Sequence, residues 1–189
     1  MILIMYKTLF YGLILWAACS AKVYTLDVSD HADAVVEQGT ILEALLGDLG
    51  FADFVSMDLT ASEELRNQGV EPGDIRDVFL TAFSLSVVDP QGGDLSFINT
   101  MDIYVEAPGL PRVLIANAPE FPEGQGRVDF EMENVDLTEY AVSQSMTFST
   151  DVDAHRPDAD TTIRASFSAE IGFTGQGACN QAEAARDAD

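Results

Sequence analysis

Aspartate clusters are the residues of this chain whose type and spacing most directly favour a bound metal ion. Calcium takes about six to eight hard oxygen ligands, and several of them are often loop aspartates. The chain has 32 acidic and 9 basic residues, and a bound divalent cation would relieve the resulting self-repulsion. The sequence therefore predicts a calcium site in one acidic hairpin, formed by Asp151, Asp153, Asp158 and Asp160. Solvated carboxylates are the alternative, because so acidic a chain also produces such clusters by chance.

A second acidic run, Asp27, Asp30 and Asp33, is expected just after the first predicted strand. Neither run matches the EF-hand loop, which needs a glycine at its sixth position and a glutamate at its twelfth. His31 and His155 each lie in an aspartate-rich predicted loop, where each could join carboxylates around a metal ion. The alternative is that both histidines are solvated loop residues.

Catalytic residues cannot be assigned from the sequence. The chain lacks the G-x-S-x-G motif of one large hydrolase class. Glycoside cleavage needs two carboxylates that meet across the fold, so spacing along the chain does not locate them. Tyr24, Tyr104 and Tyr140 could stack on sugars, and Tyr104 is the one expected on an outward strand face. We expect a protein that is not an enzyme; the alternative is an extracellular polymer hydrolase of the glycoside type with dispersed carboxylates.

The N-terminal segment MILIMYKTLFYGLILWAACS has the parts of a secretory signal. Lys7 precedes an apolar run over residues 9–18, and small residues follow it. This run is shorter than the roughly 20 residues that span a bilayer. We therefore expect the rest of the chain to lie outside the cytoplasm.

The end of this segment resembles the signal of bacterial lipoproteins, in which a Leu-like residue and two small residues precede a lipidated cysteine. Ala17, Ala18 and Cys19 match that pattern, and Trp16 departs from it. The resemblance implies lipidation of Cys19, and Ser20 after it implies an outer membrane or cell-surface location. The alternatives are an ordinary signal cleaved near residue 21 and an uncleaved anchor.

The net charge of −23 constrains the partners. Such a chain repels nucleic acid and anionic lipid headgroups, so neither is an expected partner. We expect a membrane contact through the N-terminal lipid, and an envelope protein or polysaccharide as partner. Once Cys19 carries a lipid or is removed with the signal, Cys179 has no partner within the chain.

Period-two alternation dominates the remaining sequence and is typical of strands that bury one face. Residues 161–173 are the clearest case, with Phe167 expected inward and Arg164 and Ser166 outward. Phe130 and Phe148 are expected inward on two other strands. The predicted strands are residues 23–28, 54–59, 78–88, 101–105, 112–116, 126–133, 146–152 and 161–173.

Helical signals are few and cover residues 40–46, 62–68 and 136–142. The sequence therefore predicts a single antiparallel all-β sandwich of about eight strands, Greek-key or jelly-roll-like, with one to three short helices. Its expected organisation is a signal over residues 1–19, the sandwich over 20–174 and a disordered acidic tail over 175–189. Residues 94–116, DLSFINTMDIYVEAPGLPRVLIA, also resemble a segment of uncharacterised secreted bacterial β-proteins, a resemblance that supports the fold and implies no activity. The expected role is structural or binding, in the cell envelope.

Overall fold

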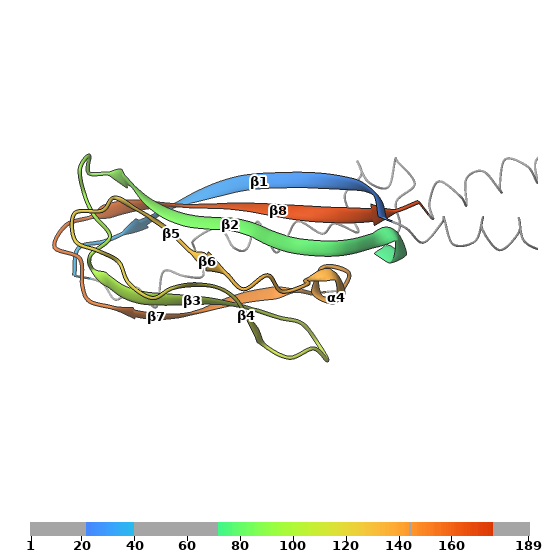
Figure 1. Ribbon diagram of the computed structural model, residues 1–189. Helices are drawn as coiled ribbons and strands as arrows, with labels where there is room; N and C mark the ends of the chain where they lie inside the picture. The colour runs from blue at the N-terminus through green and yellow to red at the C-terminus, as the bar shows by residue number, and fades with distance from the viewer. Residues whose placement is uncertain (1–21, 40–71, 144, 176–189) are drawn as a thin grey trace, which may run out of the picture.

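The computed structural model describes residues 22–39, 72–143 and 145–175, and within these ranges eight strands form two antiparallel sheets (Figure 1). Sheet A has the order β1 (Lys22–Val36), β8 (Thr161–Thr174), β2 (Ile75–Asp89) and β5 (Arg127–Asp129). Sheet B has the order β6 (Glu131–Met132), β4 (Val113–Ala118), β3 (Ile98–Glu106) and β7 (Thr147–Ala154). The two sheets form two layers, which confirms the predicted all-β sandwich.

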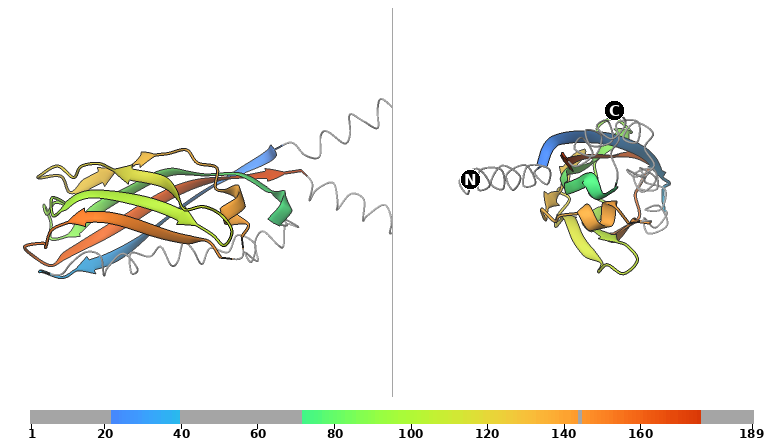
Figure 2. Two further views of the ribbon diagram at one scale, coloured as in Figure 1. Left: turned by 90° about the horizontal axis from the view of Figure 1, so that it is seen from below. Right: turned by 90° about the vertical axis from the view of Figure 1, so that its right-hand side faces the viewer.

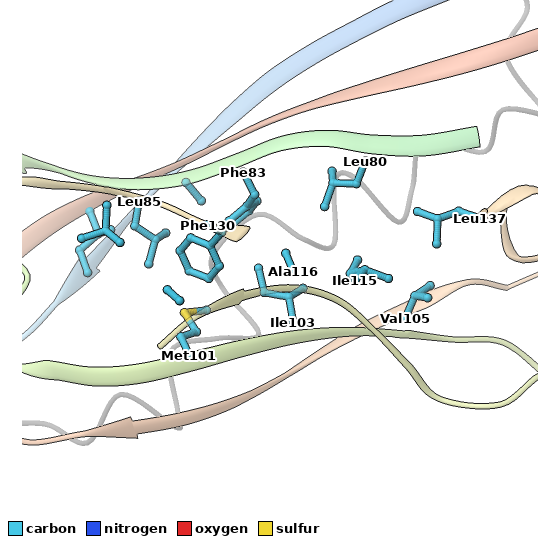
Figure 3. Close-up of a cluster of buried hydrophobic side chains, with 14 of the residues drawn as sticks. Leu80, Phe83, Leu85, Met101, Ile103, Val105, Ile115, Ala116, Phe130 and Leu137 are labelled. Carbon is cyan, nitrogen blue, oxygen red and sulfur yellow. The ribbon is translucent and has the colours of Figure 1, made fainter. Parts of the chain in front are cut away.

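The core lies between the two layers, where the alternation of the strands places it. Figure 3 shows side chains of β2 and β3 that meet there, and those labelled are Leu80, Phe83, Leu85, Met101, Ile103 and Val105. On β8, Ile163 and Ile171 are buried, whereas Arg164 and Ser166 on the other face are partly exposed. The predicted inward faces are therefore confirmed.

Phe130 marks the point where one predicted strand divides into two. Residues 126–133 were expected to form a single strand, but β5 pairs with β2 in sheet A and β6 pairs with β4 in sheet B. The N–H of Phe130 donates to the carbonyl of Phe83 at 2.9 Å, and the N–H of Glu133 donates to the carbonyl of Ile115 at 3.0 Å. The chain therefore crosses from one layer to the other here, as strands do at the corners of sandwiches.

The strand order confirms the Greek-key part of the prediction. When β5 and β6 are taken as one crossing strand, sheet B reads β7, β3, β4 and β6 in space. A Greek key places its fourth strand beside its first in this way. The last described strand, β8, lies between β1 and β2, so sheet A joins the start of the described chain to its end.

The first strand is longer than predicted. The sequence indicated residues 23–28 followed by an aspartate-rich loop, but β1 continues to Val36 and pairs with β8 over its whole length. Asp27, Asp30, His31 and Asp33 therefore all lie within β1, and the prediction of a loop over Asp30, His31 and Asp33 was wrong. Pairing with a long neighbouring strand outweighs the low intrinsic preference of Asp for strands.

Helical structure is minor in the described ranges. The predicted helix over residues 136–142 is present as α4 (Thr138–Ala141), and a 3₁₀ turn, η2 (Pro72–Asp74), precedes β2. Neither is long enough to cross a membrane. Several predictions lie outside the described residues: the signal over 1–19, the strand over 54–59, the helices over 40–46 and 62–68, and the tail beyond residue 175.

Candidate functional site

The long strands separate the two ends of the sandwich. Lys22 pairs with Thr174 at one end of β1 and β8, and Val36 pairs with Thr161 at the other. Figure 2 shows β1 beginning and β8 ending at the same end of the molecule. The opposite end is formed by connecting segments, and we call it the distal loop end; it comprises residues 37–39, 90–97, 119–126 and 155–160.

Hydrogen bonds join the segment after β1 to the segment before β8 at the distal loop end. The N–H of Gln38 donates to Oδ1 of Asp160 at 2.7 Å, and its Nε2 donates to the carbonyl of Asp158 at 2.5 Å. The N–H of Gly39 donates to the carbonyl of Pro157 at 3.2 Å. Three bonds between segments far apart in sequence fix the relative position of these two segments.

Asp94 joins the other two segments. Its Oδ1 accepts the Ser96 hydroxyl at 2.7 Å, and its Oδ2 accepts the N–H of Gly124 at 2.9 Å. These bonds, the Ser96 hydroxyl first, hold the pKa of the Asp94 carboxyl below its ordinary value. The N–H of Leu95 also donates to the carbonyl of Gln125 at 3.1 Å. The distal loop end is therefore braced, in the sense that hydrogen bonds hold its connecting segments to one another in two pairs.

The four predicted calcium ligands fall into two groups. Asp151 and Asp153 are exposed residues of β7, while Asp158 and Asp160 lie in the segment that binds Gln38. Both oxygens of Asp151 accept hydrogen bonds from Arg112. Within the described ranges no three His, Cys, Asp or Glu side chains gather to hold an ion. The predicted hairpin was wrong, because β7 belongs to sheet B and β8 to sheet A, so the segment between them crosses from one layer to the other. Calcium binding there stays a prediction.

The second acidic run has a different role on each face of β1. Asp33 pairs with Arg164 on β8 through two hydrogen bonds of 2.7 Å, which hold the pKa of Asp33 below its ordinary value. Asp30 accepts the N–H of His31 at 2.7 Å. His31 and His155 are both exposed, and metal binding by either of them remains a prediction.

A network on the outward face of sheet B was not foreseen from the sequence. The guanidinium carbon of Arg112 lies 3.5 Å from the ring centroid of Tyr104. Its nitrogens donate to Asp151 at 2.9 and 3.2 Å and to Ser149 at 3.1 Å. The bond to Asp151 raises the pKa of Arg112, and partial desolvation, followed by the charge of Asp102, raises that of Tyr104. Tyr104 faces outward as predicted, and Arg112 stacks on its ring.

The register also shows which carboxylates oppose each other. Asp102 of β3 and Asp151 of β7 are direct partners on the outward face of sheet B. A hydrolase would need both to act as free acid and base or nucleophile, but Arg112 occupies both oxygens of Asp151. Tyr140 is buried and its hydroxyl donates to the carbonyl of Pro111 at 2.8 Å, while the side chain of Tyr24 lies outside the described part.

Asn117 lies beside this pair. Asn117 is the partner of Asp102 on one side and of Glu131 on the other. Since Asp102 also pairs with Asp151, four residues with side-chain oxygens form one row across sheet B: Asp151, Asp102, Asn117 and Glu131. Its Oδ1 is the buried side-chain atom without a hydrogen-bond partner among the described residues. The row concentrates oxygen atoms and negative charge on this face.

Comparison of the chain with protein-family models and with curated proteins found no match.

Proposed function

We propose that this chain is an exported, lipid-anchored β-sandwich protein of the cell envelope, with a structural or binding role and no catalytic activity. The observation that supports this proposal is the separation between the start of β1 and the braced distal loop end. A module held at one end and ordered at the other is suited to present a surface to a partner.

The dimensions agree with such a role. Cys19 precedes Lys22 by three positions, so a lipid on Cys19 would hold the start of β1 within about 10 Å of the membrane surface. β1 has 15 residues, and at about 3.3 Å per residue it spans roughly 50 Å. The distal loop end would therefore stand well beyond the lipid headgroups.

The charge of the distal loop end also favours an orientation in which this end points away from the membrane. The described residues of the distal loop end include one arginine, Arg156, and six acidic residues: Glu37, Asp94, Glu120, Glu123, Asp158 and Asp160. An anionic membrane surface repels such a cluster. The acidic end would point away from the membrane and toward an envelope protein or polysaccharide.

The anchor is tested by mass spectrometry of the N-terminus together with membrane fractionation. Wild type should carry acyl chains on Cys19 and sediment with membranes, and Cys19→Ala should be soluble. One acyl chain holds a protein to a membrane only marginally, so the expected modification has at least two. An unmodified wild-type N-terminus in the soluble fraction would remove the anchor from the proposal.

The binding role is tested by cosedimentation with isolated envelope polysaccharide. Changing Glu120 and Glu123 together to Gln should alter binding, because both lie at the distal loop end. Changing Glu106, near the opposite end of β3, to Gln is the matched control and should have no effect. Release of reducing sugars that is lost in Asp102→Asn would instead favour the hydrolase.

A further inference from the structure

The two sheets differ in how their edge strands are exposed to another chain. Within the described residues, the edges formed by β5 and β6 have three and two residues, whereas β1 has 15 and β7 has eight. An edge strand presents backbone N–H and C=O groups that a strand of another molecule can pair with. Among the described edge strands, β1 is therefore the longest that a second copy could extend.

Asp30 lies on the core-facing side of this edge. The register aligns Phe83 of β2, Phe167 of β8 and Asp30 of β1 in one row, and residues paired in this way share a face of the sheet. Phe83 is 3% exposed and belongs to the core, Phe167 is partly buried and Asp30 is exposed. Val28 and Ala32, the neighbours of Asp30 on this face, are partly buried and apolar or small.

The other acidic residues of β1 lie on its opposite face. Asp27 pairs in register with Glu170, and Asp33 pairs with Arg164, both of which alternate outward along β8. Of the three aspartates, Asp30 alone interrupts the apolar face. Among the described residues its hydrogen bond is a local one, to the N–H of the next residue, and does not join β1 to another described strand.

We propose that Asp30 prevents β1 from pairing with β1 of a second copy of this chain. Antiparallel pairing of two β1 strands about their middle would continue sheet A from one copy into the other. The core-facing sides of both copies would then lie side by side on one face of the joined sheet, and the two Asp30 carboxylates would be enclosed close together beside the two Phe167 rings. Enclosing carboxylates without cationic partners is strongly unfavourable. Inward-pointing charges protect edge strands in other β-proteins by the same mechanism.

This inference does not depend on the proposed anchor or binding role, because it concerns only β1, the edge of sheet A among the described strands. It is tested by sedimentation velocity of the full chain in detergent solution, over a series of protein concentrations. Wild type should remain monomeric and Asp30→Val should form dimers, with a dimer dissociation constant at least about tenfold below that of wild type. Hydrogen exchange should show new amide protection in β1 of the Asp30→Val dimer.

Asp27→Val is the matched control, since it removes the same charge from the outward face of the same strand. It should remain as monomeric as wild type. Asp30→Asn keeps the side-chain shape without the charge and should also dimerise, so it decides the question if Asp30→Val does not fold. Equal association of the Asp27 and Asp30 variants, dimeric wild type, or monomeric folded Asp30 variants would each overturn the proposal.

Discussion

Replacing Phe130 with alanine is expected to lower the free energy of unfolding by about 3–5 kcal/mol, the usual cost of truncating a buried phenylalanine. Phe130 is 7% exposed and lies between the layers at the crossing from sheet A to sheet B (Figure 3). Its ring makes edge-to-face contacts with Phe83 at 4.8 Å and with Phe121 at 6.1 Å between centroids. The alanine variant would lose both contacts and leave a cavity where the two layers are joined.

Phe130→Leu separates the contribution of the aromatic contacts from the contribution of the filled volume. Leucine fills most of the volume but loses the ring geometry, so a smaller loss of about 1–3 kcal/mol is expected from two aromatic pairs. For a domain of this size each kcal/mol lowers Tm by about 2–4 °C, so Phe130→Ala should lower it by about 10 °C or more. Urea unfolding followed by far-UV circular dichroism measures both values, with the slope unchanged if the unfolded state is unaffected.

Phe167→Ala is the comparison that could refute this reasoning. Phe167 faces inward on β8 as predicted, but it is only partly buried beside the edge strand. Its truncation should therefore cost clearly less than that of Phe130. Glutamate at Phe130 should likewise be worse than glutamate at Phe148 or Phe167. An equal loss at Phe130 and Phe167 would mean that burial at the crossing does not determine stability.

Three further predictions concern the polar networks. Arg112→Lys keeps the charge but cannot stack and bind both Asp151 oxygens at once, so amide exchange in residues 107–112 should accelerate while far-UV circular dichroism is unchanged; unchanged exchange would contradict this. The pKa of Asp94 is lowered, so its stabilisation is present above the ordinary value of 3.8 and is lost as the pH falls through the lower folded-state value. The Tm difference between wild type and Asp94→Asn should therefore shrink below pH 3.8, and a constant difference would refute the ionic origin. If calcium binds the segment between β7 and β8 with a Kd of about 0.1 mM, about 1 mM calcium should stabilise wild type by about 1.4 kcal/mol. Asp153→Asn with Asp160→Asn should abolish this, and an equal Tm shift in ionic-strength-matched sodium would indicate charge screening.

The local alternation of apolar and polar residues was sufficient to predict where most of the described strands lie, but not which strands pair with one another. The alternation over residues 161–173 identified β8 almost to its ends, because each inward residue meets the core directly. The SDHAD run in β1 was taken for a loop, since aspartate is unfavourable in strands when considered alone. Its strand conformation depends on β8, which lies far away in sequence.

The Arg112 network could not be predicted for a related reason. The turn before β4 returns Arg112 to the neighbourhood of Tyr104, and this proximity is local. Ser149 and Asp151 come from β7, and their position depends on the register of β7 against β3. A shift of one residue in that register would turn both side chains to the other face.

The position of β8 between β1 and β2 has a consequence for how the protein folds. β1 is made first, yet its strand partner among the described residues is the last strand made. At about 5–20 residues per second, β1 waits on the order of ten seconds for that partner during synthesis. The pairing of β1 with β8 can therefore form only after β8 has been made, and it costs chain entropy because it brings together two segments that are far apart in sequence. We expect slow, all-or-none folding of the complete polypeptide, in the millisecond-to-second range typical of sandwiches dominated by distant contacts. During synthesis, β1 therefore has no described strand partner until β8 has been made.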